Sequence, residues 1–234
     1  MDRHEFGRRL AEAARAMSGT RHPADTLEHI AAMAVDLIGP CAVAGVCVLR
    51  PGRNDTCAHS HASVQVMDDL QHDLAEGPAM DGPSTADVVS IGDLTKDAPW
   101  PRWAEEAVAR TGVRSYLGFR LFVEDDDSIG MLNLYAYEPN AFDHEDRLDG
   151  LVAAAHASVA LSTTVRHDQL HTALTSRQLI GEATGILRER FSLTSDQAFA
   201  VLKRLSSQQN IKLFAVAQHV VETGTLPSPA PSSP

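Results

Sequence analysis

The stretch RQLIGEATGILRERF, residues 177–191, decides the fold of the C-terminal part of this chain. Its apolar residues recur in steps of three and four, which predicts the buried face of a helix: Ile180, Ala183, Leu187 and Phe191. The same stretch holds Gly181 and Gly185, although each glycine costs a helix interior about 1 kcal/mol relative to alanine. A helix with two such residues needs a reason for them.

The two glycines share a neighbouring stripe of this helix with two arginines, in the order Arg177, Gly181, Gly185 and Arg188. One interpretation is structural, because glycine allows a second helix to approach closely. The other is functional, because a smooth strip lets nucleic acid approach while the two guanidinium groups hold phosphates. The spacing alone does not separate these interpretations.

The composition is that of a protein with a real core. The chain has 234 residues, enough for one large or two small domains, and 44% of them are hydrophobic. We find no apolar run near 18 residues and no signal-peptide pattern, so we expect a cytoplasmic protein without a membrane partner. Cys41, Cys47 and Cys57 have no CxxC spacing, which argues against disulfides and a zinc site.

The charge is distributed unevenly along the chain. Residues 174–222 hold six basic and four acidic side chains, a net charge of +2. The whole chain has a net charge of -11, so the remaining residues carry -13. An acidic protein repels nucleic acid, but a small basic module on it need not. This asymmetry suggests two domains with different tasks.

The order of predicted elements indicates an α+β sheet with flanking helices, joined by a long helix to an all-α three-helix bundle. We expect a helical arm at 1–22, a sheet domain at 23–162, a connecting helix at 163–173, a helical domain at 174–224 and a disordered tail at 225–234. Capping boxes are predicted at Asp25 with Glu28 and at Thr194 with Gln197.

A long helix is predicted from Asp143, its N-cap, and it carries an apolar pattern with steps of four and three: Leu148, Val152, Ala155 and Val159. The pattern fades and resumes at Leu170 and Leu174. It fits either a helix packed on its own sheet or the seam of a dimer that continues into the next module.

Residues 174–224 closely resemble the ANTAR domain, the three-helix RNA-binding module of bacterial transcription antiterminators. The resemblance rests on "IG-A-GIL" at 180–187, "AF-VLKR-S" at 198–206 and "KL--VA--VV" at 212–221. It implies a homodimer that binds paired stem-loops in a nascent transcript and so prevents a terminator hairpin. Our candidate RNA-binding residues are Arg177, Gly181, Ala183, Thr184, Gly185, Arg188, Lys203, Arg204 and Lys212. The family often has lysine at Thr184 and methionine at Arg188, so the first departure removes a possible phosphate contact and the second adds a charge nearby.

Residues 23–162 resemble a GAF domain of the kind fused to ANTAR modules, through the segments at 70–82, 97–115 and 130–147. GAF domains sense small molecules or mediate dimers, so the resemblance implies an unknown ligand and no identified cofactor. Relatives usually have cysteine and leucine at Ala79 and Met80, which excludes thiol chemistry at Ala79. The candidate pocket walls, each of which could equally be plain core, are Met67, Leu70, Met80, Trp100, Trp103 and Tyr116.

Other patterns carry less. His59 and His61 alternate as metal ligands on a strand would, but a third ligand is missing. The acidic turn at 124–128 lacks the oxygen pattern of a calcium loop. His156, His167 and His171 could form a pH switch but are more simply solvated. GxSxG, P-loop, HExxH and GxGxxG motifs are absent, so we expect no enzyme.

The sequence therefore predicts an RNA-binding antiterminator regulated by a GAF sensor. One alternative is a ligand-binding or dimerisation protein whose helical tail never touches nucleic acid. A second is a DNA-binding helix-turn-helix regulator, which is weaker because a strongly basic recognition helix is missing.

Overall fold

A five-stranded antiparallel sheet is the centre of residues 1–167, the first of the two units into which the chain divides. The computed structural model describes the chain except residues 21, 51–52, 81–86, 97, 123–128 and 228–234. The strands lie in the order β2-β1-β5-β4-β3. Their bounds are β1 Val43–Arg50, β2 Arg53–His59, β3 Val88–Ile91, β4 Ser115–Phe122 and β5 Ile129–Ala136. The predicted architecture, an antiparallel sheet with flanking helices followed by a long helix and C-terminal helices, is confirmed.

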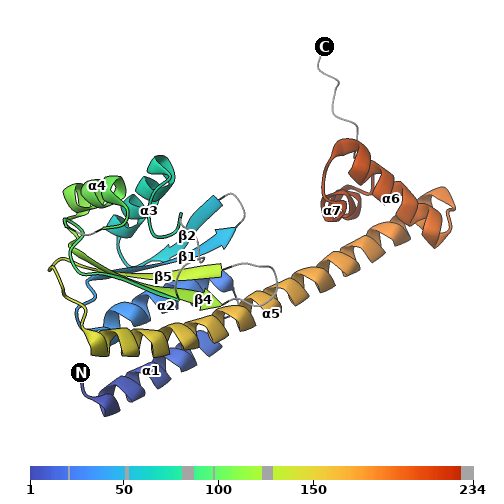
Figure 1. The fold of residues 1–234 in the computed structure, drawn as a ribbon. Coiled ribbons are helices and arrows are strands. Elements are labelled where there is room, and N and C mark those ends of the chain that lie inside the picture. Colours follow the sequence, from blue (N-terminus) through green and yellow to red (C-terminus); the bar gives the residue numbers. More distant parts are fainter. Residues whose placement is uncertain (21, 51–52, 81–86, 97, 123–128, 228–234) are drawn as a thin grey trace. The chain divides into compact units, whose positions relative to one another are not determined.

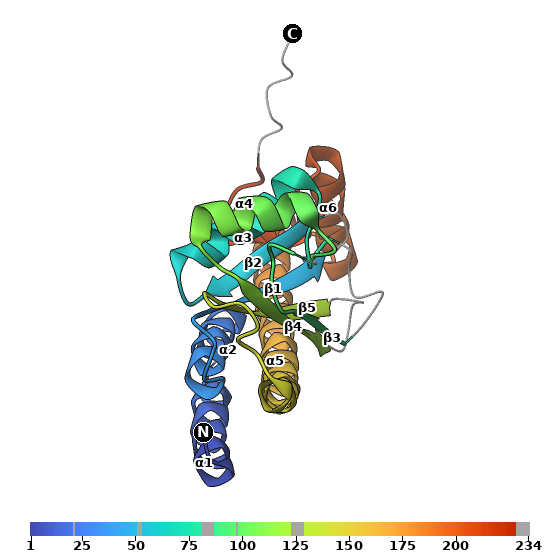
Figure 2. The same cartoon turned by 60° about the vertical axis from the view of Figure 1, so that its left-hand side comes forward.

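Helices cover both faces of this sheet (Figure 1). One face packs against α2 (Pro23–Leu37) and the start of α5 (His144–Phe191), while α1 (Arg3–Ser18) packs mainly on α2. The other packs against α3 (Ala62–Leu74) and α4 (Pro101–Thr111), which lie across the strands in Figure 2. Because side chains alternate along a strand, Leu117 of β4 enters the first core and Tyr116 the second. Burial on both faces explains why β4 is apolar at nearly every position.

The helix starts predicted in the first unit have different outcomes. Asp143 caps α5 as predicted, since its Oδ1 accepts a hydrogen bond of 3.0 Å from the Asp146 amide. The capping box predicted at Asp25 is wrong: α2 begins two residues earlier at Pro23, and His22 precedes it without a side-chain cap. Proline starts the helix there because its ring fixes φ and its missing N–H needs no partner.

The first part of α5 is apolar on two opposite sides. Ala153, Ala157 and Leu161 face the sheet and are buried. The predicted seam lies on the other side, where Val152 is 42% and Val159 69% exposed. The helix does pack on the domain's own sheet, as one of the two alternatives predicts, but it does so through Ala153, Ala157 and Leu161 and not through the residues of the predicted pattern.

The sequence analysis predicted no apolar run near 18 residues, and α5 differs from that prediction. Among the described residues, α5 is the one helix with an 18-residue window apolar enough to span a membrane by length and composition, and 39% of that window is buried inside the structure. No such run was expected, because the alanines that make the window apolar are interspersed with polar residues. Ala153, Ala154 and Ala157 of this part of α5 are buried in the core of the first unit.

The second unit, residues 168–234, contains the end of α5 together with α6 (Ser195–Gln209) and α7 (Leu213–Thr223). Its core is formed by seven buried residues: Ala183, Leu187, Ala198, Leu202, Val216, Ala217 and Val220. The predicted capping box of Thr194 with Gln197 is confirmed at the start of α6. Phe191 departs from the predicted buried face, since α5 ends at this residue and leaves it 51% exposed.

Candidate nucleic-acid interface and ligand site

The glycine strip of α5 is open. A Cβ atom built on Gly181 or on Gly185 would meet no neighbouring atom within 4 Å among the described residues. Arg177 and Arg188, which bracket the glycines, are exposed. The structure therefore does not support the interpretation in which the two glycines allow a second helix of the same chain to approach closely. What remains is a smooth helix surface between two guanidinium groups.

The other residues implied in RNA binding differ in their exposure. Lys203 and Arg204 of α6 and Lys212, which precedes α7, are exposed. Thr184 is half-buried, and its hydroxyl donates a hydrogen bond of 2.6 Å to the Ile180 carbonyl oxygen. Ala183 is fully buried in the core of the second unit, so its assignment as an RNA-binding residue is corrected to a packing role.

A shallow hollow of about 650 Å³ adjoins the strip. Six residues line it: Glu182, Gly185, Ile186, Glu189, Arg190 and Val221. Arg190 has a structural task there, since its Nη1 donates a hydrogen bond to the Gly224 carbonyl oxygen. The sequence analysis missed Ile186 and Val221, although both are apolar residues half-exposed beside Gly185. The strip is therefore bordered by the cations Arg177 and Arg188 and by a hollow whose walls include two glutamates as well as the apolar Ile186 and Val221.

In the first unit, the predicted pocket walls form a packed aromatic cluster. Trp103 and Tyr116 are fully buried, and Trp100 contacts both rings edge to face with centroids 6.1 and 6.5 Å away. The Trp103 Nε1 donates a hydrogen bond of 3.0 Å to the Met67 carbonyl oxygen. Leu70 is buried with them and Met80 is half-buried, next to residues 81–86, which lie outside the described part.

Beneath this cluster lies a buried polar network on the same face of the sheet. The Tyr116 hydroxyl donates to the Asn133 Oδ1 at 2.9 Å, and the Asn133 Nδ2 donates to the Cys47 Sγ at 3.5 Å. Asn133 of β5 pairs with Gly45 of β1 on one side and with Gly118 of β4 on the other. A Cβ on Gly118 would collide with the Tyr116 hydroxyl, so glycine provides the space that the tyrosine occupies.

Two buried polar atoms near this network have no hydrogen-bond partner among the described residues: the Asp68 Oδ2 and the Tyr135 hydroxyl. The other Asp68 oxygen accepts a hydrogen bond of 3.1 Å from Gln71, whose Oε1 accepts one of 2.8 Å from the Ala79 amide. Burial, and to a lesser extent the charge of Asp69, raises the pKa of Asp68 to about 7. Burial likewise raises the pKa of Tyr135 well above its usual value, which keeps this phenol neutral.

The sequence analysis did not select Asp68, Gln71, Tyr135 or Asn133, although a signal existed for two of them. Asp68 stands four residues after buried Val64 and three before Gln71, on the apolar face of α3. Asn133 is the one amide in an otherwise apolar strand. A polar residue on a buried face is the informative observation.

The weaker patterns have simple outcomes. His61 is not on a strand with His59, because β2 ends at His59 and His61 is the N-cap of α3. No group of three metal-ligating side chains occurs in the described ranges. His156, His167 and His171 are exposed, and the acidic turn at 124–128 falls outside what the structure describes.

Comparison with protein families gives two matches. A family model of the GAF domain matches residues 20–162, and a model of the ANTAR domain matches residues 168–221. No curated protein matches the chain.

Solved structures show the fold of the first unit. The GAF domain of a phosphoenolpyruvate-protein phosphotransferase from Acinetobacter is 14% identical, with a TM-score of 0.52 over 71% of this chain and 97% of that one. A free methionine-R-sulfoxide reductase from Neisseria meningitidis, solved with its substrate, has the same identity and TM-score over 71% and 94%. The photosensory core module of a Stigmatella aurantiaca phytochrome is 10% identical, with a TM-score of 0.57 over 91% and 45%.

Proposed function

Because this chain belongs to the GAF family and carries an ANTAR domain at residues 168–221, we propose that it is a cytoplasmic, RNA-binding regulator of transcription. In this proposal the ANTAR domains of a homodimer bind paired stem-loops of a nascent transcript. Their binding prevents the competing terminator hairpin, so transcription continues. The GAF domain regulates this activity.

The observation that carries the proposal is the open strip between Arg177 and Arg188. Proteins read RNA mainly at loops, whose exposed bases a helix surface can reach, and cations hold the adjoining phosphates. A helix surface without side chains at Gly181 and Gly185 allows that close approach. In the hollow beside Gly185, the apolar Ile186 and Val221 offer a surface against which an unstacked base could lie.

The test compares binding of the full chain to a two-stem-loop RNA and to duplex DNA of equal length at moderate salt. We expect preference for the RNA, and an Arg177→Ala, Arg188→Ala double variant should bind it at least about tenfold more weakly, since each guanidinium–phosphate contact contributes about 1 kcal/mol or more. Arg102→Ala, which removes the same charge from an exposed site on α4, should bind as the wild type does.

Two results would contradict the proposal. Preference for duplex DNA would favour the helix-turn-helix regulator. Absence of binding to either nucleic acid, with the fold intact by circular dichroism, would favour the alternative in which the helical tail only packs.

For the GAF domain we propose a small polar ligand held by Asp68 and Tyr135. Buried polar atoms in folded proteins nearly always have a hydrogen-bond partner. A ligand that carries a hydrogen-bond donor and an acceptor would provide a partner for the Asp68 Oδ2 and for the Tyr135 hydroxyl. A thermal-shift screen of amino acids and small amides tests this. A ligand of the site should raise the melting temperature of the wild type but not of Tyr135→Phe, and an equal shift in both would refute the assignment.

A further inference from the structure

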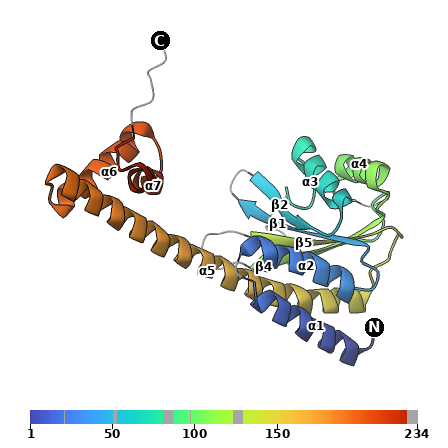
Figure 3. The same cartoon turned by 180° about the vertical axis from the view of Figure 1, so that it is seen from behind.

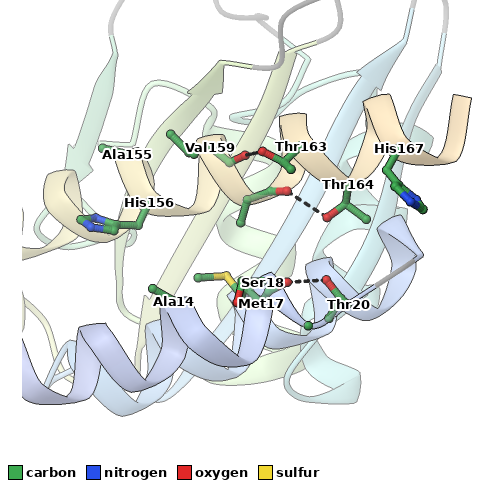
Figure 4. A pocket seen from close by; sticks show the side chains of 12 residues that line it. Ala14, Met17, Ser18, Thr20, Ala155, His156, Val159, Thr163, Thr164 and His167 are labelled. Atoms are coloured by element: carbon green, nitrogen blue, oxygen red, sulfur yellow. Dashed lines mark hydrogen bonds between the residues drawn. The ribbon is translucent and has the colours of Figure 1, made fainter. Parts of the chain in front are cut away.

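Two surfaces of this chain expose apolar side chains of different chemistry. In the first unit, a groove of about 690 Å³ lies between α1 and the first part of α5, and its walls include Ala14, Met17 and Val159 (Figure 4). No phenylalanine, tyrosine or tryptophan is among the residues that line this groove. In the second unit, two aromatic side chains flank the connection between α5 and α6, where Phe191 is 51% and Phe199 43% exposed. The second surface therefore offers flat rings, which the groove does not.

The aromatic side chains of the second unit lie outside its core. This unit contains three phenylalanines and no tyrosine or tryptophan. The core described for it is aliphatic, and Phe191, Phe199 and Phe214 belong neither to that core nor to the partly buried residues packed against it. Phenylalanine is usually among the most buried residues, because its ring removes a large apolar area from water. Three rings outside an aliphatic core indicate a task other than packing within the unit.

The end of α5 holds the Phe191 ring in an exposed place. The Leu193 amide donates a hydrogen bond of 3.3 Å to the Arg188 carbonyl oxygen, and Leu193 packs against the core in place of Phe191. The Arg190 Cζ lies over the Phe191 ring, 6.0 Å from its centroid, within the range of a cation–π contact. Because the Arg190 Nη1 donates a hydrogen bond to the Gly224 carbonyl oxygen, the cation on this face of the ring is fixed to the fold.

A cation accompanies each of the two exposed rings. On α5, Phe191 follows Arg188 by three residues and so continues the strip that Arg188 ends. On α6, which starts where α5 ends (Figure 3), Lys203 follows Phe199 by four residues. Side chains three or four residues apart are neighbours on a helix surface. Arg188 and Lys203 are both exposed, and within the described ranges neither forms an ion pair. Both helices thus present a ring beside an available positive charge.

We infer that Phe191 and Phe199 stack on unpaired bases of the RNA loops, while Arg188 and Lys203 hold the adjoining phosphates. The inference rests on the proposed function and deepens it, because it names side chains that contact bases. In sequence-specific RNA recognition, loop bases are turned out of the stack and lie on aromatic side chains. A phenylalanine ring accepts any base, because every base has a π-face. Duplex DNA does not offer such faces, since its bases are already stacked on one another.

The charges around the rings favour RNA over an apolar protein surface as the partner. Within five residues of either ring, four exposed cations stand against two carboxylates, a net charge of +2: Arg188, Arg190, Lys203 and Arg204 against Glu189 and Asp196. An apolar partner would take these cations out of water without supplying anions, which is costly. RNA supplies flat bases for the rings and phosphates for the cations together.

The first test measures binding of the full chain to the two-stem-loop RNA. Phe191→Leu and Phe199→Leu keep an apolar side chain that suits a helix but remove the ring. Each variant should bind the RNA at least about fivefold more weakly, which is the lower end of the effect of stacking on one base. Phe122→Leu is the matched control, because Phe122 is an exposed phenylalanine of the first unit, and it should bind as the wild type does.

The second test identifies the bases by removing them one at a time. Abasic nucleotides are placed singly at each loop position of the RNA, and binding is measured for the wild type and for both leucine variants. For each ring we expect one loop position whose abasic RNA binds the wild type at least about fivefold more weakly than the intact RNA does. The variant without that ring should bind this abasic RNA as strongly as the wild type binds it, because ring and base act as a pair.

Several results would overturn the inference. If both leucine variants bind RNA as the wild type does, the rings do not contact bases, and the proposed function stands on the wild type's preference for RNA. If a variant loses the same affinity for every abasic RNA as for the intact RNA, its ring supports the fold and not a base. A lower mass of a variant in solution would assign its ring to contact between protein copies. Absence of RNA binding by the wild type refutes the proposed function and the inference together.

Discussion

Two pairs of glycines inside regular elements of this chain differ entirely in their surroundings. Gly45 and Gly118 flank Asn133 in the buried sheet, and a Cβ on either would collide with the side chain of Val64 or Tyr116. Gly181 and Gly185 lie on the surface of α5, where an added Cβ meets nothing within the described structure. Packing within the protein explains the glycines of the first pair but not those of the second.

The difference separates two reasons for placing glycine in a regular element. In the sheet, the side chain of Val64 or Tyr116 fills the space that a Cβ on the glycine would occupy, which improves the packing of the core. On α5, two glycines weaken the helix by about 2 kcal/mol together without any intramolecular gain. Because nothing in the described structure offsets this loss of helix stability, we infer that the two glycines serve contact with a partner molecule.

The largest expected effect is at Gly118. Gly118→Ala should lower the free energy of unfolding by about 4 kcal/mol, because overpacking costs about 1–3 kcal/mol and displacing the Tyr116 hydroxyl from Asn133 leaves buried groups unpaired. Urea denaturation measures this. The same substitution at Gly181 is the control, and equal effects at both positions would remove the distinction between the two pairs.

The polar network beside Gly118 predicts a pH effect of intermediate size. The pKa of Asp68 is raised from 3.8 to about 7, so the folded chain binds its proton more tightly than the unfolded chain does. The stability from the neutral acid is complete below about pH 4 and is lost as the pH rises through 7.

Asp68→Asn keeps a neutral side chain at every pH, so its stability relative to wild type should increase by about 2–3 kcal/mol between pH 5 and pH 8. Thermal unfolding at the two pH values measures the change. Asp73→Asn, an exposed position on the same helix, should show no such increase. A constant difference between Asp68→Asn and wild type would show that Asp68 is ionised in the folded protein.

The smallest expected effect on stability is at Gly181 and Gly185, and substitutions there test most directly whether the surface pair contacts RNA. Gly181→Ala and Gly185→Ala should each stabilise the fold by about 1 kcal/mol, as Gly7→Ala should in the equally open helix α1. RNA affinity should fall by about tenfold in the first two variants and stay unchanged in the third. Unchanged RNA affinity in all three would mean that the strip does not face RNA.

Local signals predicted much of the fold. Thr194 with Gln197 and Asp143 placed two helix starts, and the three-step and four-step apolar spacing placed the core residues Ala183 and Leu187. These features depend on residues within one turn of each other. Asp25 failed because a proline two residues earlier starts α2 before the aspartate can act as its cap.

The sites were harder because they depend on what lies across the structure. Spacing could not show that the space over Gly181 is open, nor that Ala183, two residues away, is buried. The aromatic residues expected as pocket walls fill their own space, whereas two buried polar atoms without a hydrogen-bond partner among the described residues belong to Asp68 and Tyr135, on different elements. Only the paired register of three strands brings Gly45, Asn133 and Gly118 into one row.

The continuity of α5 has a consequence for its middle. Every residue from Gln169 to Thr175 is exposed, so this stretch keeps its helical form by backbone hydrogen bonds and by the packed segments before and after it. A helix of such length is marginal in water when nothing packs on it. Amide hydrogens there should exchange within α5 soonest, and a protease should cut there first. Any event that stiffens or melts these two turns would change how cooperatively the two domains unfold.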